Sequence, residues 1–193
     1  MGNMPKTADD WLEALHHEFH SETDRAAVIV VASMVDEALR LLLDRRLIPP
    51  LRNDKGILES ANAPLGTFSA RISAAHQLGL ISKFMAADLH TVRKIRNEFA
   101  HNIFGCTFES QSVKDRISNL QRNSRFNERN KETRKSVGPP GQRWDFLGIT
   151  AWMLYALHRE AEGVQRLTEH LPEFGYYDLD NIEGIEVKSK DTT

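Results

Sequence analysis

Arg96, Asn97 and His101 bring three chemically versatile side chains close together in the sequence. A guanidinium group binds anions through a rigid fork of N–H donors, and an imidazole exchanges a proton near neutral pH. The spacing of Arg and His alone arises often by chance, whereas the adjacent Asn makes the pattern R-N-x-x-x-H more specific. These three residues are therefore the first candidates for a functional site.

A helix is expected to position these groups, because Ser82 is suited to be an N-cap and apolar residues then recur at steps of three and four. The apolar stripe comprises Met85, Leu89, Val92, Ile95, Phe99 and Ile103. A second, polar stripe of His90, Lys94, Asn97 and His101 runs beside it, with Arg96 at the boundary. The segment 82–101 is thus predicted to have one core face and one basic face.

The same periodicity predicts further helices over about 8–19, 22–46, 68–78, 112–120 and 144–171, with almost no strand signals. Ser21 with Asp24 resembles a capping box for the second helix, and Thr67 is expected to cap the third. Gly79 is expected to end that third helix in the left-handed conformation. We therefore expect an all-α protein: a single domain over residues 1–193, built as a bundle of about five or six helices.

Asp36 and Glu37 interrupt a largely apolar helix, where a charged group must be paired or turned to solvent. Either carboxylate could support an arginine at the edge of the core, such as Arg71 or Arg96. Plain exposure on the surface of the helix is the alternative. The sequence leaves the two interpretations open.

The composition is that of an ordinary globular protein, with 40% hydrophobic residues and a net charge of -2. The single Cys106 cannot form an intramolecular disulfide, and neither a signal-peptide pattern nor a membrane-length apolar run is present. We therefore expect a cytoplasmic protein without a membrane span. Cys106 has no partner at zinc spacing, and the histidines at 16, 17 and 20 lack arranged carboxylates, so no metal or other cofactor is expected.

Residues 121–143 carry seven Lys and Arg against two Glu, a net charge of +5. With Gly138-Pro139-Pro140-Gly141 near its end, this stretch is predicted to be a basic loop insertion. It is either a solvated insertion or a contact for nucleic acid. The arginines that would contact RNA are Arg122, Arg125, Arg129 and Arg134. Residues 173–193 are predicted to form an acidic, weakly ordered tail.

The R-N-x-x-x-H pattern, late in a helix of an all-helical bundle, resembles the motif of the HEPN superfamily (higher eukaryotes and prokaryotes nucleotide-binding). More locally, GTFSARISAAHQLGLIS followed by DLHTVRKIRNEFAH is similar to bacterial proteins of the mannitol operon repressor family. This second resemblance covers residues 64–120 well and 26–47 loosely. The basic stretch and the tail lie outside it.

The HEPN resemblance implies a metal-independent endoribonuclease of the toxin or defence kind, with an antitoxin as a further partner. Two protomers of a homodimer would bring their motifs together. His101 would then act as general base or acid, and Arg96 would bind the scissile phosphate. Asn97 would orient the phosphate or His101. Arg93 and the arginines of the basic stretch would bind RNA, which alone carries the internal 2′-hydroxyl nucleophile.

The mannitol repressor resemblance implies instead a noncatalytic transcriptional regulator or adaptor that contacts a regulatory protein. No helix-turn-helix with a basic recognition helix is evident in the sequence. In this alternative Arg96 would pair with a carboxylate, while Asn97 and His101 would cap the end of their helix. The candidate carboxylates are Asp36, Glu37 and Asp88. Both interpretations predict a homodimer.

Overall fold

The computed structural model describes residues 4–60, 62–102, 104–124 and 141–170, and only the backbone of 121–124. These residues form six α-helices and no strand, which confirms the predicted all-α bundle. The helices are α1 (Ala8–Phe19), α2 (Asp24–Arg46), α3 (Phe68–Gln77), α4 (Lys83–His101), α5 (Gln111–Ser124) and α7 (Gln142–Gly163). None of them is long and apolar enough to cross a bilayer.

The first four helices each begin after a Ser or Thr whose hydroxyl accepts a backbone N–H of the first turn. The caps predicted at Thr67 and Ser82 are confirmed. The start of α2 was predicted too early, because Thr23 rather than Ser21 supplies the cap. After α3, Gly79 adopts a φ of 71°, the left-handed conformation expected there.

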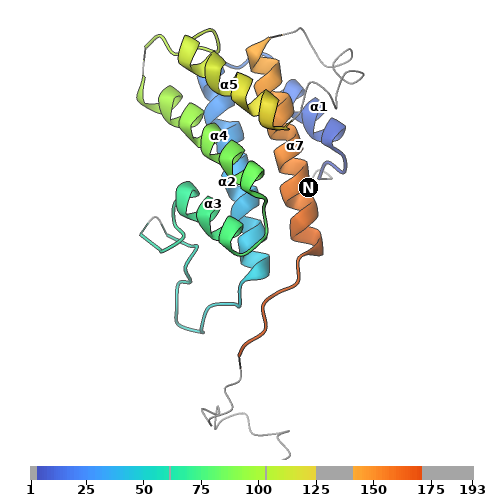
Figure 1. Ribbon diagram of the computed structural model, residues 1–193, viewed down its shortest axis with the longest axis vertical. Coiled ribbons are helices and arrows are strands. Elements are labelled where there is room, and N and C mark those ends of the chain that lie inside the picture. The colour runs from blue at the N-terminus through green and yellow to red at the C-terminus, as the bar shows by residue number, and fades with distance from the viewer. Residues whose placement is uncertain (1–3, 61, 103, 125–140, 171–193) are drawn as a thin grey trace, which may run out of the picture.

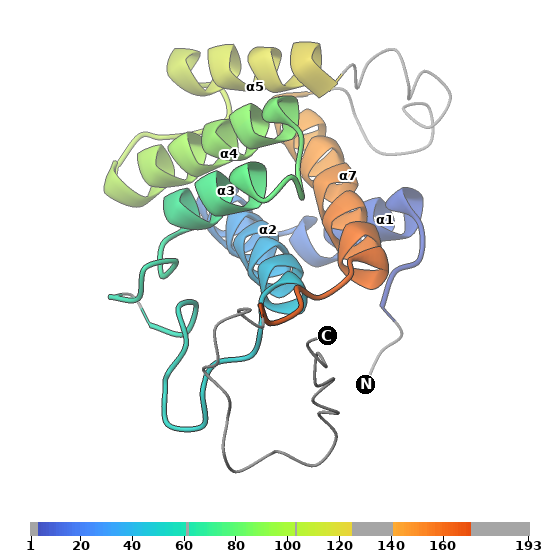
Figure 2. The ribbon, with the colours of Figure 1, turned by 60° about the horizontal axis from the view of Figure 1, so that its bottom comes forward.

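The central helix is α2, which packs against α3, α4 and α7 (Figure 1). Figure 2 shows α5, α4 and α3 stacked in that order on one side of the molecule, while α1 lies against α7. The many buried residues of α2 explain its position, since a helix that is apolar on several sides must be covered on several sides. They include Ala27, Val28, Val31, Val35, Leu39, Leu42 and Leu43.

The core face of α4 is fixed by its apolar stripe. Its fully buried members are Leu89, Val92, Ile95 and Phe99. The ring of Phe99 lies 5.5 Å from that of Phe108, which in turn lies 5.7 Å from Phe146 of α7. This aromatic series joins α4 to α7 through the core. Lys94 and His101 consequently remain exposed on the opposite side of the helix, and Arg96 is exposed at the edge of the core face.

The end of α7 differs from the prediction. The helix stops at Gly163, not near residue 171. The chain then runs along the end of α2, where the N–H of Leu167 donates to Arg46 O at 2.8 Å and Arg46 Nη1 donates to Gln165 O at 2.7 Å. Val164 and Leu167 continue the helical spacing in the sequence, but Val164 has extended dihedral angles and Leu167 is hydrogen-bonded to the end of α2.

Helices occupy both ends of the stretch predicted as a basic loop at 121–143. Residues 121–124 continue α5, and Gln142 and Arg143 begin α7. Arg143 Nη1 pairs with Asp24 Oδ1 at 2.6 Å and so joins the starts of α7 and α2. Residues 125–140, like the predicted tail at 173–193, lie outside the described part of the chain.

Candidate functional site

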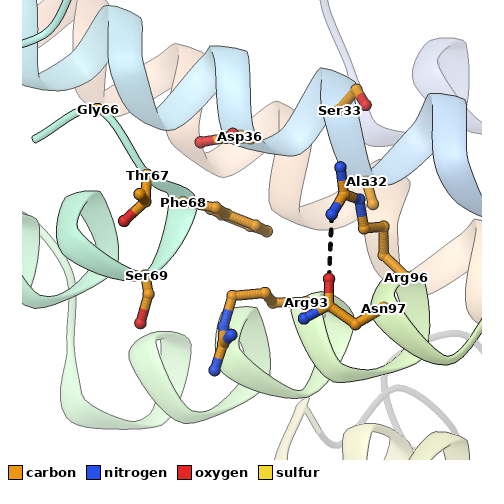
Figure 3. A pocket seen from close by; sticks show the side chains of 10 residues that line it. All are labelled: Ala32, Ser33, Asp36, Gly66, Thr67, Phe68, Ser69, Arg93, Arg96 and Asn97. Carbon is orange, nitrogen blue, oxygen red and sulfur yellow. Dashed lines mark hydrogen bonds between the residues drawn. The ribbon is translucent and has the colours of Figure 1, made fainter. Parts of the chain in front are cut away.

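A pocket of about 350 Å³ opens between α2, the start of α3 and α4 (Figure 3). From α4 it receives Arg93, Arg96 and Asn97, because residues three and four positions apart share one face of a helix. The polar residues of the other two walls are Ser33, Asp36, Thr67 and Ser69. We refer to this hollow as the arginine pocket.

Arg96 is exposed, and its Nη1 donates a hydrogen bond to Asn97 Oδ1 at 3.0 Å. Figure 3 shows its guanidinium directed toward α2, beside Ser33. The bond occupies the carbonyl oxygen of the Asn97 amide and leaves the NH₂ group as a donor. Within the described chain no carboxylate pairs with Arg96, so the pairing considered from the sequence does not occur there.

Arg93 is half-buried and forms the opposite side of the arginine pocket. Its Nε is buried and has no hydrogen-bond partner among the described residues. Figure 3 shows the guanidinium extending toward Ser69 at the start of α3. The two arginines therefore diverge from one helix and line different parts of a shared hollow.

The carboxylate of Asp36 is neutralised at the edge of this pocket. Arg71 Nη1 lies 2.8 Å from Asp36 Oδ1, and the arginine side chain is only 11% exposed. Arg71 also approaches the carbonyl oxygens of Leu58 and Gly66, each at 3.4 Å. Asp36 thus forms an ion pair that joins α2 to α3, and it does not compensate the charge of Arg93 or Arg96.

Glu37 points to a different partner. Arg40, one turn further along α2, donates two hydrogen bonds to its carboxylate at 2.7 and 2.8 Å. These bonds lower the pKa of Glu37 below the usual value for a glutamic acid. The pair lies on the surface and plays no part in the arginine pocket.

His101 is the last residue of α4, is exposed, and does not line the arginine pocket. Within one chain, therefore, Arg96 and Asn97 lie together and His101 lies apart. The carbonyl oxygens of Phe99 and Asn102 at this helix end accept hydrogen bonds from Arg25 of α2. Arg25 thus takes the capping role that the sequence had suggested for Asn97 and His101.

His90 lies one turn before Arg93 on α4. Burial lowers the pKa of His90 below the ordinary histidine value, and the positive charges of Arg93 and Lys94 lower it further. A neutral imidazole is therefore favoured at neutral pH. The cations on this face of α4 are then Arg93, Lys94 and Arg96.

The arginines predicted to contact RNA are only partly placed. Arg93 lines the pocket, whereas the side chain of Arg122 and all of Arg125, Arg129 and Arg134 lie outside the described residues.

His16 of α1 forms ring contacts with His20, just after that helix, and with α7. His16 stacks on Trp144 at 4.3 Å between ring centroids and lies 5.7 Å from His20. Across the described ranges, no group of three or more His, Cys, Asp or Glu side chains is arranged to hold a metal ion.

The contribution of α3 to the pocket was not predicted from the sequence. Thr67 was expected only as a cap, yet it lines the hollow together with Phe68 and Ser69. The ring of Phe68 extends between the arginine side chains in Figure 3. No local pattern could show this, because the position of the start of α3 depends on how α3 packs against α2 and α4.

Comparison with known proteins identifies a fold but no family. No protein-family model matches the sequence, and no curated protein matches it significantly. A similar solved structure is a chain of the MtlR-HPr complex from Escherichia coli, which aligns over 78% of this chain and 97% of its own length, with a TM-score of 0.54 and 17% sequence identity. At this identity the likeness shows the fold alone. The chain has an MtlR-like helical fold.

Proposed function

We propose that this chain is a cytoplasmic regulatory protein of the mannitol repressor kind, which acts by binding another protein. The supporting observation is the shared fold with a chain from the MtlR-HPr complex, over nearly the whole length of that chain. A protein of the HPr type is accordingly the proposed partner. The role requires no catalysis, and the chain is proposed to act as a homodimer.

The proposed contact surface is the exposed side of α4. Phe84 at its start is 61% exposed, and Phe104 just beyond its end is 91% exposed. Aromatic side chains and arginine are enriched in the centres of protein interfaces. Here two exposed aromatic rings lie near the two ends of a helix that also carries Arg93, Lys94 and Arg96, a combination suited to a partner surface with apolar and acidic groups.

The test is calorimetric titration of purified HPr from the same cell into the full chain. A saturable heat of binding is expected, and Phe104→Ser should weaken it about fivefold or more, as truncation of an interface anchor does. Leu51→Ser is the matched control, since Leu51 is 79% exposed but lies in the loop between α2 and α3. Absence of binding by the unaltered chain would contradict the proposed partner.

A HEPN-like ribonuclease is the second candidate, favoured by the bond between Arg96 and Asn97 and by their position in one pocket. Because His101 lies outside that pocket, catalysis would need the imidazole of a second chain. Mixed RNA is incubated in EDTA with the unaltered protein and, in parallel, with His101→Ala. This comparison distinguishes the regulatory protein from the ribonuclease. The regulatory role predicts intact RNA with both proteins. Cleavage that disappears in His101→Ala would establish the ribonuclease instead.

A further inference from the structure

The charges of the arginine pocket do not balance within the described chain. Arg71 compensates Asp36, while neither Arg93 nor Arg96 has a carboxylate partner there. Glu98, on another side of α4, accepts a hydrogen bond from Ser112 and pairs with Arg116 of α5. Two guanidinium charges therefore face a single hollow without an anion to match them.

The hydrogen-bonding groups around the hollow are mostly donors. Ser33 and Asp36 are exceptions, because the Ser33 hydroxyl donates to Ile29 O at 2.8 Å and the Asp36 carboxylate, which pairs with Arg71, can only accept. The other available groups are both guanidinium ions, the Asn97 NH₂ and the Ser69 hydroxyl. An anion with several acceptor oxygens would satisfy them together.

The start of α3 adds two backbone donors. Thr67 accepts the N–H of Ala70 at 3.2 Å, which leaves the first two N–H groups of the helix without partners inside the helix. Gly66, Thr67, Phe68 and Ser69 all line the pocket, so this helix end faces it. Its partial positive charge reinforces the preference for an anion.

We infer that the arginine pocket binds a small phosphomonoester, whose dianion compensates the charges of Arg93 and Arg96 and whose organic group packs against Phe68. A dianion matches two uncompensated guanidinium charges, and its three terminal oxygens can accept hydrogen bonds from several of the donors that line the hollow. The volume of about 350 Å³ suits a small ligand. The Phe68 ring, which extends between the arginines in Figure 3, supplies an apolar wall.

The shape favours a terminal phosphate over an RNA strand. A phosphodiester is flanked by sugars on both sides and is usually bound in an extended basic groove with several stacked aromatic side chains. This pocket is a single hollow, and Phe68 is the one aromatic residue among the described residues that line it. The titration that tests this site uses no HPr, so its outcome does not depend on the proposed partner.

The test is calorimetric titration of phenyl phosphate, inorganic phosphate and phenol into the purified full chain at low ionic strength. Phenyl phosphate is expected to bind most tightly, inorganic phosphate more weakly and phenol not detectably. Arg96→Gln and Arg93→Gln should each weaken phenyl phosphate about tenfold or more, the loss that follows removal of a charge-assisted hydrogen bond. Because Arg93 is half-buried, the exposed Arg96 provides a variant whose folding is not at risk.

Lys94→Gln is the matched control. It removes one positive charge from the helix that carries Arg93 and Arg96, but Lys94 does not line the pocket. Binding in this variant should change less than about twofold, the size of an exposed-charge effect. If Lys94→Gln weakens binding as much as the arginine variants, or if phenyl phosphate does not bind, the inference is wrong. If a single-stranded RNA oligonucleotide displaces phenyl phosphate at equal concentration, the site belongs to RNA instead.

Discussion

Arg71 of α3 holds Asp36 of α2 in an ion pair of 2.8 Å at the edge of the arginine pocket. The contact fixes the start of α3, and with it Phe68 and Ser69, beside α4. Asp36 is the one carboxylate among the described residues of the pocket lining, and its pairing with Arg71 leaves the charges of Arg93 and Arg96 uncompensated. The pocket's shape and its net positive charge therefore depend on the same pair.

Loss of this pair is predicted to destabilise the bundle. Arg71→Met should lower the free energy of unfolding by about 2 kcal/mol, because it leaves a partly sheltered carboxylate without its charged partner. Arg40→Met is the control, since Arg40 pairs with Glu37 on the surface and its loss should cost under about 1 kcal/mol. Urea unfolding followed by circular dichroism measures both. Equal effects in the two variants would show that the Arg71 pair has no special role.

Arg25 is predicted to hold the end of α4 in place. It donates to the carbonyl oxygens of Phe99 and Asn102, which have no partner inside the helix. Arg25→Met should therefore lower the free energy of unfolding by about 1–3 kcal/mol and speed amide exchange in the last turn of α4. Arg52→Met, in the exposed loop after α2, should leave both quantities unchanged. Unaltered exchange in Arg25→Met would refute this capping role.

The stability of the chain is predicted to fall in mild acid through His158. Burial lowers the pKa of this histidine, with Arg45 acting in the same direction and Glu162 opposing both. Its ring stacks on the Trp11 ring, with 5.2 Å between the ring centroids. The unfolded chain then takes up a proton at a higher pH than the folded chain, so the free energy of unfolding decreases as pH falls below about 6.5.

Unfolding by urea at a series of pH values from about 7.5 to 5.5 measures this dependence. His158→Phe keeps an aromatic ring against Trp11 but cannot be protonated, so its stability should vary less with pH than that of the unaltered chain. His90, whose pKa is also lowered, supplies part of the remaining slope. An unchanged slope in His158→Phe would exclude the proposed linkage.

The sequence predicted the helices well where the signals were local. The hydroxyls of Thr67 and Ser82, Gly79, and the apolar stripe of α4 each act within a few residues, and the structure places them as expected. The prediction for the end of α7 was wrong because Arg46 at the end of α2 forms hydrogen bonds with Gln165 and Leu167 beyond the helix. That contact joins segments more than one hundred residues apart, so the periodic spacing of apolar residues in the sequence could not predict it.

The candidate site could be predicted only in part for the same reason. Helical spacing placed Arg96 and Asn97 near each other, and their position in one pocket follows from α4 itself. The separation of His101 from this pocket, the pairing of Arg71 with Asp36 and the approach of Ser69 depend on how α2, α3 and α4 pack. Arg25 is a similar case, since only the folded chain brings it to the end of α4.

Sedimentation velocity of the full chain with and without HPr tests the proposed role most directly. The chain alone is expected to sediment as a dimer, and addition of HPr should produce a heavier species whose amount saturates with HPr concentration. Phe104→Ser should keep the dimer and lose most of the heavier species, whereas Leu51→Ser should retain both. A chain that sediments identically with and without HPr would contradict the proposal that it acts by binding this partner.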